Sequence, residues 1–511
     1  MIRTVHVENG WVRGLPAADP RITSYKGIPY AAPPVGENRW RAPQPCADWE
    51  GTLDAFVFSP IPMQAPISAD PQNLYDREWH VDKEIPMGED CLTLNVWAPA
   101  DGRKDMPVFV WYFGGGLQVG YSAEMEFDGE RIARRGIVVV TVNYRVNVFG
   151  FLCHSEITRE APDAPANFGL LDQQAATRWV KRNIAAFGGD PENITIGGQS
   201  AGGMSVSAQL TCRENKGLFQ RAIIQSGAFA PPYPFEFGLC STLQAAEERG
   251  KAFFDFLGVS SLAEARRVDA VTLRNKALEW EGIYGWGKTF GEAVDGVFSR
   301  RNSQQWFVDP DRLPVPVLLG HTSSEFIHAP QAGNEQELRA FAASAFGDGA
   351  EEFLRFFSHP ADAESIKKEG GVNTIEFAIR AAALHQQRTG SSLPLYYYRF
   401  DADIPGWDHP GTFHSVDLWF FFETLAKCWR PFKGKHYDLA RQMCDYWCRF
   451  IKTGSPNGEG SDGEPLPWWP AFSEEEQVRM NFGDTAAPQA CQETGLLRFL
   501  MERTLERMDK Q

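Results

Sequence analysis

The sequence predicts an α/β protein, in which a central, mostly parallel sheet carries helices on both faces. Continuous apolar runs at 107–112 and 136–144 are typical of strands that are buried on both sides. Segments with helical periodicity, such as 172–187, alternate with these strands, as the crossovers of a parallel sheet require. The 511 residues contain no internal repeat and no low-complexity linker, so we expect one domain over residues 1–511.

The N-terminal region is expected to be mainly extended. Residues 1–6 alternate apolar and polar side chains, as strands do. Prolines are too dense for a helix in 22–45, which we expect to run as extended chain over the surface. Residues 60–86 form a long, polar, proline-rich loop, and because loops of this length are often functional, we expect it to border a site.

Strands and helices alternate through the middle of the chain. Alternating apolar and polar side chains predict a strand at 92–97, and helical periodicity predicts a helix at 128–135. The other elements expected in this part are strands at 107–112, 136–144, 194–196 and 222–227 and the helix at 172–187.

The pattern changes after about residue 235. Amphipathic helices are expected at about 235–300 and 335–390, as excursions over the edge of the sheet where the active site is expected. Strands return at 314–319 and 395–400, and the second of these is the last strand that the pattern shows clearly. A further helix is expected at 436–452.

The stretch Gly198-Gln199-Ser200-Ala201-Gly202 fits the pattern G-x-S-x-G, a sharp turn from a strand into a helix. The turn strains the backbone of Ser200, so the residues two positions away on either side must lack a Cβ. The Ser200 hydroxyl then stands at a helix N-terminus and attacks a carbonyl carbon once a histidine removes its proton. On these five residues alone, a glycine-rich turn without catalytic function is an equally good interpretation.

An attacking serine also needs an oxyanion hole and an acid, which open α/β sheets supply from loops after the strands. Gly114-Gly115-Gly116 follows the strand at 107–112, and three residues without Cβ allow backbone N–H groups to converge on one point. Ala201, directly after the serine, is expected to donate another N–H group. Glu325 is the sole carboxylate in the loop after Leu319, so it is the candidate acid.

The residues by themselves leave the identity of the base open. His409 and His414 both follow the strand at 395–400, and their position does not choose between them. His321 lies in the loop that supplies the acid, so we expect it to be a structural histidine instead.

Composition excludes several classes of partner. The net charge of −16 argues against nucleic acid and anionic membrane surfaces, and no apolar run approaches the roughly 18 residues of a membrane span. The first residues contain no apolar region of a secretory signal. The nine cysteines are scattered, so we expect reduced thiols in a cytoplasmic protein and no metal site.

A set of further stretches matches one known family. The matching stretches are Lys26–Tyr30, Pro33–Gly36, Glu89–Val96, Asn143–Arg145, Asn167–Gln173, Phe187–Pro191, Gly198–Gly202, Gln225–Gly227 and Val294–Gly296. With them the chain resembles the type-B carboxylesterases, the α/β-hydrolases that include bacterial carboxylesterases and the cholinesterases. The resemblance extends from residue 26 to about residue 300, and weaker matches continue past His414.

The resemblance implies an α/β-hydrolase fold over the whole chain and a Ser, Glu, His triad in that order. Residues 320–325 resemble the family's acid loop and 413–418 its histidine loop, so His414 is the implied base and His409 is not. The residues carried over are Ser200, Glu325 and His414 as the triad, Gly115, Gly116 and Ala201 as the oxyanion hole, and Gln199 and Ser226 beside the triad.

The chain departs from the family pattern at four positions. Phe113 replaces a histidine that many members carry before the three glycines, and Phe326 replaces a glycine after the acid. Gln199 replaces a glutamate, which removes a negative charge and makes strong attraction of cationic choline esters less expected. Pro62 stands where secreted relatives have the cysteine that pairs with the equivalent of Cys91, so Cys91 is expected to be free.

The implied activity is hydrolysis of small to medium hydrophobic carboxylic esters through an acyl-enzyme, without a metal or an organic cofactor. One alternative is hydrolysis of a thioester, an amide or a carbamate, which needs the same triad chemistry. The other is a non-catalytic binding protein on the same fold. Such proteins have a broken triad, whereas all three triad positions are present here. The expected partner is a small-molecule ester, and the sequence does not determine the oligomeric state.

Overall fold

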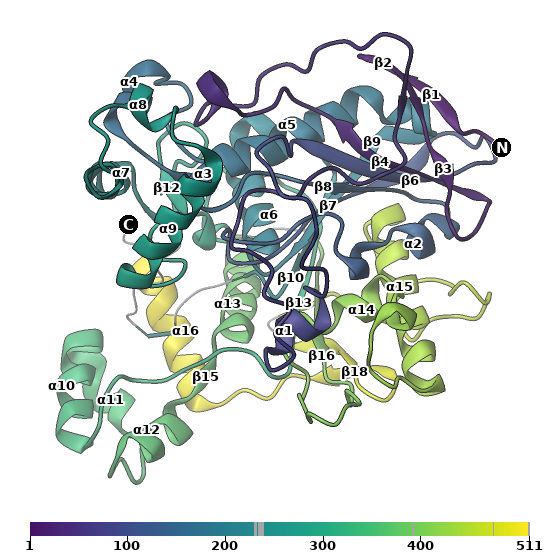
Figure 1. Cartoon of the computed structure of the whole chain (residues 1–511). Helices are drawn as coiled ribbons and strands as arrows, with labels where there is room; N and C mark the ends of the chain where they lie inside the picture. The colour runs from purple at the N-terminus through teal and green to yellow at the C-terminus, as the bar shows by residue number, and fades with distance from the viewer. Residues whose placement is uncertain (229–231, 234–239, 391–392, 474, 509–511) are drawn as a thin grey trace.

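An 11-stranded sheet runs through the computed structural model, which describes residues 1–228, 232–233, 240–390, 393–473 and 475–508. The strand order is β18-β17-β16-β13-β10-β9-β7-β8-β6-β4-β3. The strands from β17 to β8 run parallel, and antiparallel strands complete both edges. The expected central, mostly parallel sheet is therefore confirmed (Figure 1).

The parallel part of the sheet contains the strands that apolar runs predict. The sheet consists, in chain order, of β3 (Leu15–Pro16), β4 (Ile22–Pro29), β6 (Thr93–Pro99), β7 (Met106–Tyr112), β8 (Val138–Val142), β9 (Gly189–Gln199), β10 (Arg221–Gln225), β13 (Val317–Thr322), β16 (Leu395–Phe400), β17 (Val478–Phe482) and β18 (Ala486–Ala490). Smaller sheets pair β1 (Thr4–Val7) with β2 (Gly10–Arg13) and β5 (Thr52–Asp54), β11 (Cys240–Thr242) with β12 (Glu292–Val294), and β14 (Ile327–His328) with β15 (Val372–Asn373).

Helices cover both faces of this sheet, as the apolar strands require. In β7, Phe109 and Trp111 pack against Phe421, while the Tyr112 hydroxyl lies 2.5 Å from the Thr177 hydroxyl. Successive side chains of a strand point to opposite faces, so Phe421 and Thr177 cover opposite faces. The helices packed around the sheet are α2 (Glu130–Arg134), α5 (Phe168–Asn183), α6 (Ala201–Thr211), α13 (Thr374–Arg388), α14 (Leu418–Phe421), α15 (Gly434–Thr453) and α16 (Gly495–Met508).

Further helices lie in two stretches of the chain outside the sheet strands, 243–284 and 335–370. Helices α7 (Leu243–Leu257), α8 (Leu262–Ala265) and α9 (Ala270–Tyr284) gather on one side of the molecule, with α10 (Glu335–Phe346), α11 (Ala350–Leu354) and α12 (Ala363–Gly370) below them in Figure 1. Residues 235–239 of the predicted range 235–300 lie outside the described residues. Short helices α1 (Leu74–Glu78), α3 (Asn147–Phe151) and α4 (Ser155–Glu160) lie in the connecting segments. None of the described helices is both long and apolar enough to cross a membrane.

Three sequence interpretations differ from the structure. The strand at 395–400 is not the last one, because β17 and β18 follow it; β18 is mostly exposed and contains Pro488, so it lacks a clear apolar signal. Part of the extended segment 22–45 is a sheet strand, since β4 pairs with β6. The loop at 60–86 contains α1, whose first turn is capped by the side chain of Asn73.

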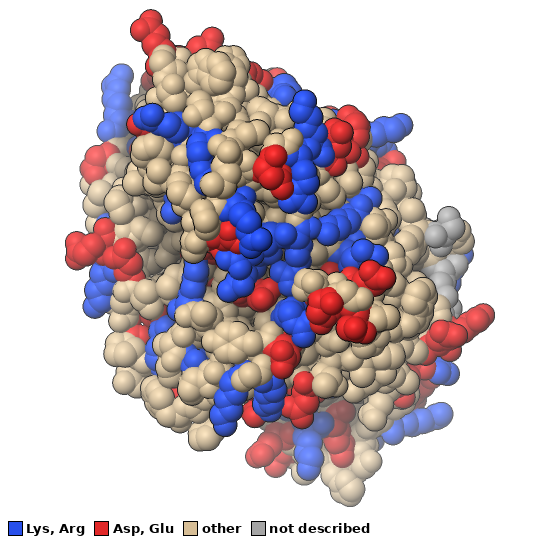
Figure 2. Space-filling model, turned by 90° about the vertical axis from the view of Figure 1, so that its right-hand side faces the viewer, with Lys and Arg blue, Asp and Glu red and all other residues tan. Residues whose placement is uncertain are grey.

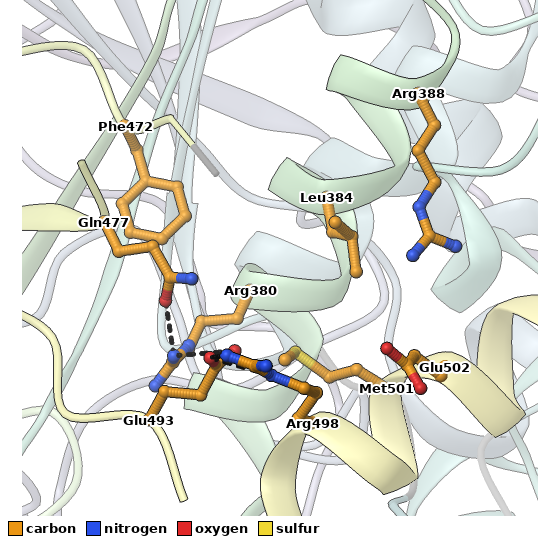
Figure 3. A pocket seen from close by; sticks show the side chains of 9 residues that line it. All are labelled: Arg380, Leu384, Arg388, Phe472, Gln477, Glu493, Arg498, Met501 and Glu502. Carbon is orange, nitrogen blue, oxygen red and sulfur yellow. Dashed lines mark hydrogen bonds and ion pairs between the residues drawn. The ribbon is translucent and has the colours of Figure 1, made fainter. Parts of the chain in front are cut away.

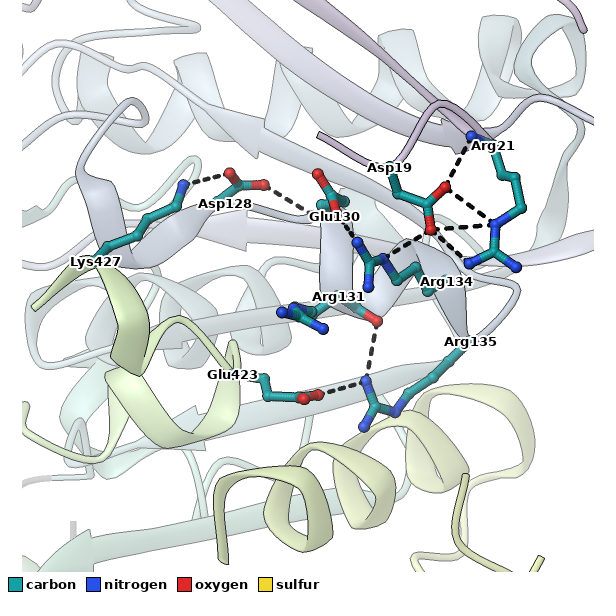
Figure 4. Close-up of polar contacts among 9 residues, drawn as sticks. All are labelled: Asp19, Arg21, Asp128, Glu130, Arg131, Arg134, Arg135, Glu423 and Lys427. Atoms are coloured by element: carbon teal, nitrogen blue, oxygen red, sulfur yellow. Dashed lines mark hydrogen bonds and ion pairs between the residues drawn. The ribbon is translucent and has the colours of Figure 1, made fainter. Parts of the chain in front are cut away.

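Ion pairs connect α2 with segments far away in the sequence (Figure 4). Arg134 pairs with Asp19 at 3.1 Å, and Arg135 pairs with Glu423 at 2.8 Å and with Asp445 of α15 at 2.6 Å. Figure 2 shows the right-hand side of Figure 1, where Lys and Arg gather in the central part of the face with Asp and Glu among them. The charges of Arg134, in α2, and of Arg135, which follows it, are therefore matched by acids from distant parts of the chain.

Two glycines inside helices provide a test of the packing between α7 and the segment that joins α3 to α4. A Cβ on Gly250 of α7 would overlap the carbonyl oxygen of Cys153, whereas a Cβ on Gly282 of α9 meets nothing within 4 Å. We expect Gly250→Ala to lower the free energy of unfolding by roughly 1–3 kcal/mol through overpacking. Gly282→Ala should raise it by about 0.5–1 kcal/mol, because alanine favours a helix. Denaturant titration followed by circular dichroism measures both, and equal effects would contradict this packing.

Candidate active site

The turn at Ser200 has the strained geometry that its sequence predicts. Strand β9 ends at Gln199 and α6 begins at Ala201, and Ser200 between them has φ 55° and ψ −125°. This conformation is rare for a residue with a side chain. A Cβ on Gly198 would overlap the backbone of Gly202, and a Cβ on Gly202 would overlap the carbonyl oxygen of Tyr112. Glycine is therefore required at both positions, and the interpretation as a functionless glycine-rich turn does not explain this strain.

A hydrogen-bonded chain of side chains lies beside this turn. The Nδ1 atom of His414 lies 2.7 Å from Oε2 of Glu325. The other carboxylate oxygen of Glu325 accepts hydrogen bonds from the hydroxyls of Ser226 at 2.6 Å and Thr322 at 3.0 Å. Ser226 follows β10, Glu325 follows β13 and His414 follows β16, so the carboxyl ends of three neighbouring parallel strands bring these groups together.

Burial and charge act in opposite directions on the Glu325–His414 pair. Burial alone raises the pKa of Glu325, but the charge of His414 and the hydrogen bonds from His414 and Ser226 outweigh burial and hold that pKa below its ordinary value. Burial lowers the pKa of His414, yet the charge and the hydrogen bond of Glu325 outweigh it and hold this pKa above its ordinary value. The ionised carboxylate therefore favours a protonated imidazole.

The second ring nitrogen of His414 faces Gln199. Nε2 of His414 lies 3.2 Å from the side-chain nitrogen of Gln199. With the proton on Nδ1 shared with Glu325, Nε2 is the acceptor and the Gln199 amide donates to it. Ser200 Oγ forms no hydrogen bond with another described residue, although Ser200 and His414 line the same cavity. The Gln199 amide thus occupies the nitrogen that a general base must present to Ser200.

The three histidines considered in the sequence analysis have different surroundings in the structure. The ring nitrogens of His321 are buried and lie 2.7 Å from the Thr322 carbonyl oxygen and 2.8 Å from the Tyr397 hydroxyl, as expected for a structural histidine. His409 is exposed to solvent. His414 alone of the three contacts Glu325.

Two of the three glycines before Leu117, Gly115 and Gly116, adopt backbone conformations that side chains disfavour. Gly115 has φ 103° and Gly116 has φ 64°. A Cβ on Gly115 would overlap the carbonyl oxygen of Val119, and a Cβ on Gly116 would overlap the ring of Trp286. Neither glycine uses its N–H group in a hydrogen bond with another described residue. Ala201 is the first residue of α6, where N–H groups have no partner within the helix.

These groups line one cavity of about 820 Å³. The loop at 60–86 borders it, as expected, through residues 64–68, Asn73, Tyr75, Asp76, Trp79 and His80. The apolar part of the wall consists of Tyr75, Trp79, Phe127, Met204, Trp286, Phe326 and Leu418. The acidic side chains Glu124 and Glu126 line the same cavity.

A smaller cavity of about 280 Å³ lies apart from this site, between α13 and α16 (Figure 3). Two of its three arginines are matched by partners in the same wall: Arg380 donates to the Gln477 side chain at 2.5 Å, and Arg498 donates to Glu493 at 3.0 Å. None of the residues that the sequence singles out for catalysis lines it.

Known esterases are similar to this chain in sequence. The model of the carboxylesterase family matches residues 2–496. The chain belongs to the carboxylesterase family. It is 33% identical to the para-nitrobenzyl esterase of Bacillus subtilis over 489 residues, covering 92% of this chain and 93% of that one. It is 31% identical to the fumonisin B1 esterase of Sphingopyxis macrogoltabida, covering 94% of this chain and 86% of that one.

A solved PNB esterase structure has the same fold. It superimposes with a TM-score of 0.80 at 30% sequence identity, and the match covers 98% of this chain and 99% of that one. The expected α/β-hydrolase fold is therefore confirmed, and the protein is a carboxylesterase, an enzyme that hydrolyses carboxylic esters. Within the described part of this carboxylesterase, no group of three or more His, Cys, Asp and Glu side chains is arranged to hold a metal ion.

Two residues of this site are not identified by the sequence analysis. Thr322 donates to Glu325 from the end of β13, a role that its position three residues before the acid does not by itself reveal. Trp286 comes from the segment after α9, and its ring covers Gly116 across 170 residues of intervening chain. A lone tryptophan among helices carries no signal for such a contact.

The acid limb of the pH profile tests the contacts of His414. A base must be neutral, so kcat/KM should fall as the pH drops through the pKa of His414, above the ordinary value of about 6.5. Gln199→Glu places a carboxylate beside Nε2, favours the imidazolium, and should shift this limb upward by about 1 pH unit. Gln72→Glu adds the same charge on the exposed surface and should not shift it. Superimposable profiles of the wild type and Gln199→Glu would contradict the contact.

Proposed function

We propose that this carboxylesterase cleaves its esters through an acyl-enzyme formed on Ser200. The observation that supports this most directly is the 2.7 Å contact between His414 and Glu325 beside the strained turn of Ser200. In this reaction His414 takes the proton from Ser200 through Nε2 as the hydroxyl oxygen attacks the ester carbonyl. Glu325 keeps the proton of Nδ1 in place and stabilises the imidazolium that forms.

The tetrahedral intermediate carries its negative charge on the former carbonyl oxygen. The N–H groups of Gly115, Gly116 and Ala201 are the proposed donors to this oxygen. His414 then returns the proton to the departing alcohol, and the acyl group stays on Ser200. A water molecule deprotonated by the same histidine attacks the acyl-enzyme, which releases the acid and restores the serine.

The hydrogen bond between the Gln199 amide and Nε2 of His414 has to break before this reaction begins. A modest rotation of either side chain exchanges the 3.2 Å amide contact for one with the Ser200 hydroxyl. Catalytic hydrogen bonds are often loose in the free enzyme and form on substrate binding. We therefore assign Gln199 and Ser226 to positioning roles, through His414 and Glu325 respectively.

The cavity supports esters with hydrophobic groups of small to medium size, because much of its wall is aromatic or aliphatic. Thioesters, amides and carbamates fit the same acyl chemistry, and comparison of leaving groups distinguishes them. The mechanism that we propose requires neither a metal nor an organic cofactor. The alternative of a non-catalytic binding protein finds no support, since the family and the relatives named above are esterases.

A cytoplasmic location is supported by the thiols. All nine cysteines are free in the structure, and Cys91 is buried. Free thiols are typical of proteins in a reducing compartment.

Replacement of the proposed nucleophile tests this mechanism. Ser200→Ala should lower kcat for p-nitrophenyl butyrate by about 10⁴–10⁶-fold while the circular dichroism spectrum stays unchanged. Ser207→Ala removes a hydroxyl from the same helix whose only hydrogen bond with a described residue is to the Gly203 carbonyl oxygen, so it should retain activity. A fluorophosphonate should label the wild type on Ser200 and leave Ser200→Ala unlabelled. Turnover or labelling that persists in Ser200→Ala would exclude Ser200 as the nucleophile.

A further inference from the structure

Two carboxyl groups in the wall of the catalytic cavity have no assigned role. Glu124 and Glu126 belong to the short 3-10 segment around 125–127, which follows the glycine loop, and both line the cavity that contains Ser200 and His414. The Glu126 residue is only 1% exposed, and its Oε2 atom is buried without a hydrogen-bond partner. A buried carboxyl oxygen without a partner is costly, so a ligand that supplies a donor would stabilise it.

Two nearby acids form ion pairs with basic side chains, whereas Glu124 and Glu126 do not. Glu78 pairs with Arg430 at 2.5 Å, and Asp128 pairs with Lys427. Neither Glu124 nor Glu126 forms an ion pair with a described Lys, Arg or His side chain. The Glu124 carboxylate accepts a hydrogen bond from the backbone N–H of Tyr121 at 3.0 Å.

The two carboxyl groups also act on each other. Burial raises the pKa of Glu126 well above its ordinary value, and the neighbouring charge of Glu124 raises it further. Two carboxyl groups at one site tend to share a proton, because both cannot ionise without a compensating cation. A cationic ligand would take the place of that proton.

We propose that Glu124 and Glu126 form a subsite for a protonated amine carried by the ester substrate. The proposal rests on the function proposed above, since the subsite and Ser200 share one cavity. An alkylammonium group offers the N–H donors that Oε2 of Glu126 lacks, and hydrogen bonds between ionised groups are stronger than neutral ones. The aromatic and aliphatic wall is then available to the carbon skeleton between the amine and the ester.

The rest of the cavity is consistent with this assignment. Asp76 also lines the cavity, but it faces His80 at 3.5 Å and accepts a hydrogen bond from the backbone of Asp70. Gln199, beside the nucleophile, is neutral. Lys288 lines the cavity too, but no ion pair joins it to Glu124 or Glu126. Among the described acids of the wall, Glu124 and Glu126 are therefore the two without a basic or histidine partner, and the preference that they create is for an amine at a distance from the scissile bond.

Matched pairs of esters test this subsite. In one pair the alcohol carries the amine: 2-(dimethylamino)ethyl acetate is compared with 3-methylbutyl acetate, which has the same shape. In the other pair the acid carries it: methyl 4-aminobutanoate is compared with methyl pentanoate. The measured quantity is the ratio of kcat/KM for the charged ester to kcat/KM for its neutral partner, at a pH where the amine is protonated. We expect the wild type to favour the charged member of at least one pair by about tenfold or more at low salt.

Three variants connect the ratio with the carboxyl groups. Glu126→Gln and Glu124→Gln keep the size of the side chain and remove its charge, and each should lower the ratio by about tenfold. Asp128→Asn removes a carboxylate two residues from Glu126 that does not line the cavity, so it should leave the ratio unchanged. If Glu126→Gln does not fold, Glu124→Gln provides the same measurement, since Glu124 is less buried.

The outcomes separate this subsite from the proposed mechanism. A preference in one pair only supports the subsite and assigns the amine to the acyl or to the alcohol side. A ratio near one in both pairs, or a ratio that Glu124→Gln leaves unchanged, overturns the subsite while neutral esters are still cleaved in a manner that needs Ser200. Neutral esters that Ser200→Ala cleaves as fast as the wild type overturn the mechanism instead.

Discussion

The close packing of the Ser200 turn against the end of β7 is the constraint on which the rest of the site depends. Gly202 lies against the carbonyl groups of Tyr112 and Phe113, and a Cβ on Gly114 would come within 2.8 Å of the Gln199 carbonyl oxygen. The turn and the glycine loop therefore fix each other's position. The backbone N–H of Ser200 also donates to the carbonyl oxygen of Gln225 at 2.9 Å, which connects the strained residue to β10. Any side chain at Gly202 or Gly114 would therefore force the turn and the glycine loop apart.

The same arrangement explains how a buried carboxylate is tolerated beside the turn. The Glu325 side chain is fully buried, and it is matched by His414 on one oxygen and by Ser226 and Thr322 on the other. A buried charge that is fully hydrogen-bonded avoids most of its desolvation cost. These donors come from the ends of neighbouring parallel strands, so the sheet itself satisfies the acid.

Much of this could be predicted from the sequence, because the relevant signals are local. Apolar runs identify the parallel strands. The pattern G-x-S-x-G identifies the turn, because the overlap that requires its first glycine arises within the same five residues. His414 could not be separated from His409 by position, because the choice depends on which side chain reaches Glu325 across the sheet. Strand β18 escaped prediction because an exposed edge strand with a proline has no apolar signature.

The acidic side chains of the cavity are a second feature that the sequence alone could not predict. Gln199 suggests a site with little attraction for cations, since the glutamate of the family is missing. Glu124 and Glu126 place carboxyl groups in the same cavity from another segment of the chain. Neither forms an ion pair with a described residue, and because this depends on packing, the spacing of residues in the sequence does not reveal it.

The contact between Trp286 and Gly116 has a consequence for the space beside the glycine loop. A side chain at Gly116 would overlap its surroundings, whereas Trp286 is 61% exposed and belongs to the connection between α9 and β12. Connections of this kind accept changes in sequence and length more readily than sheet turns do. The volume beside the proposed oxyanion hole therefore depends on a side chain outside the glycine loop, so a smaller residue at position 286 would enlarge this space and leave the loop itself unchanged.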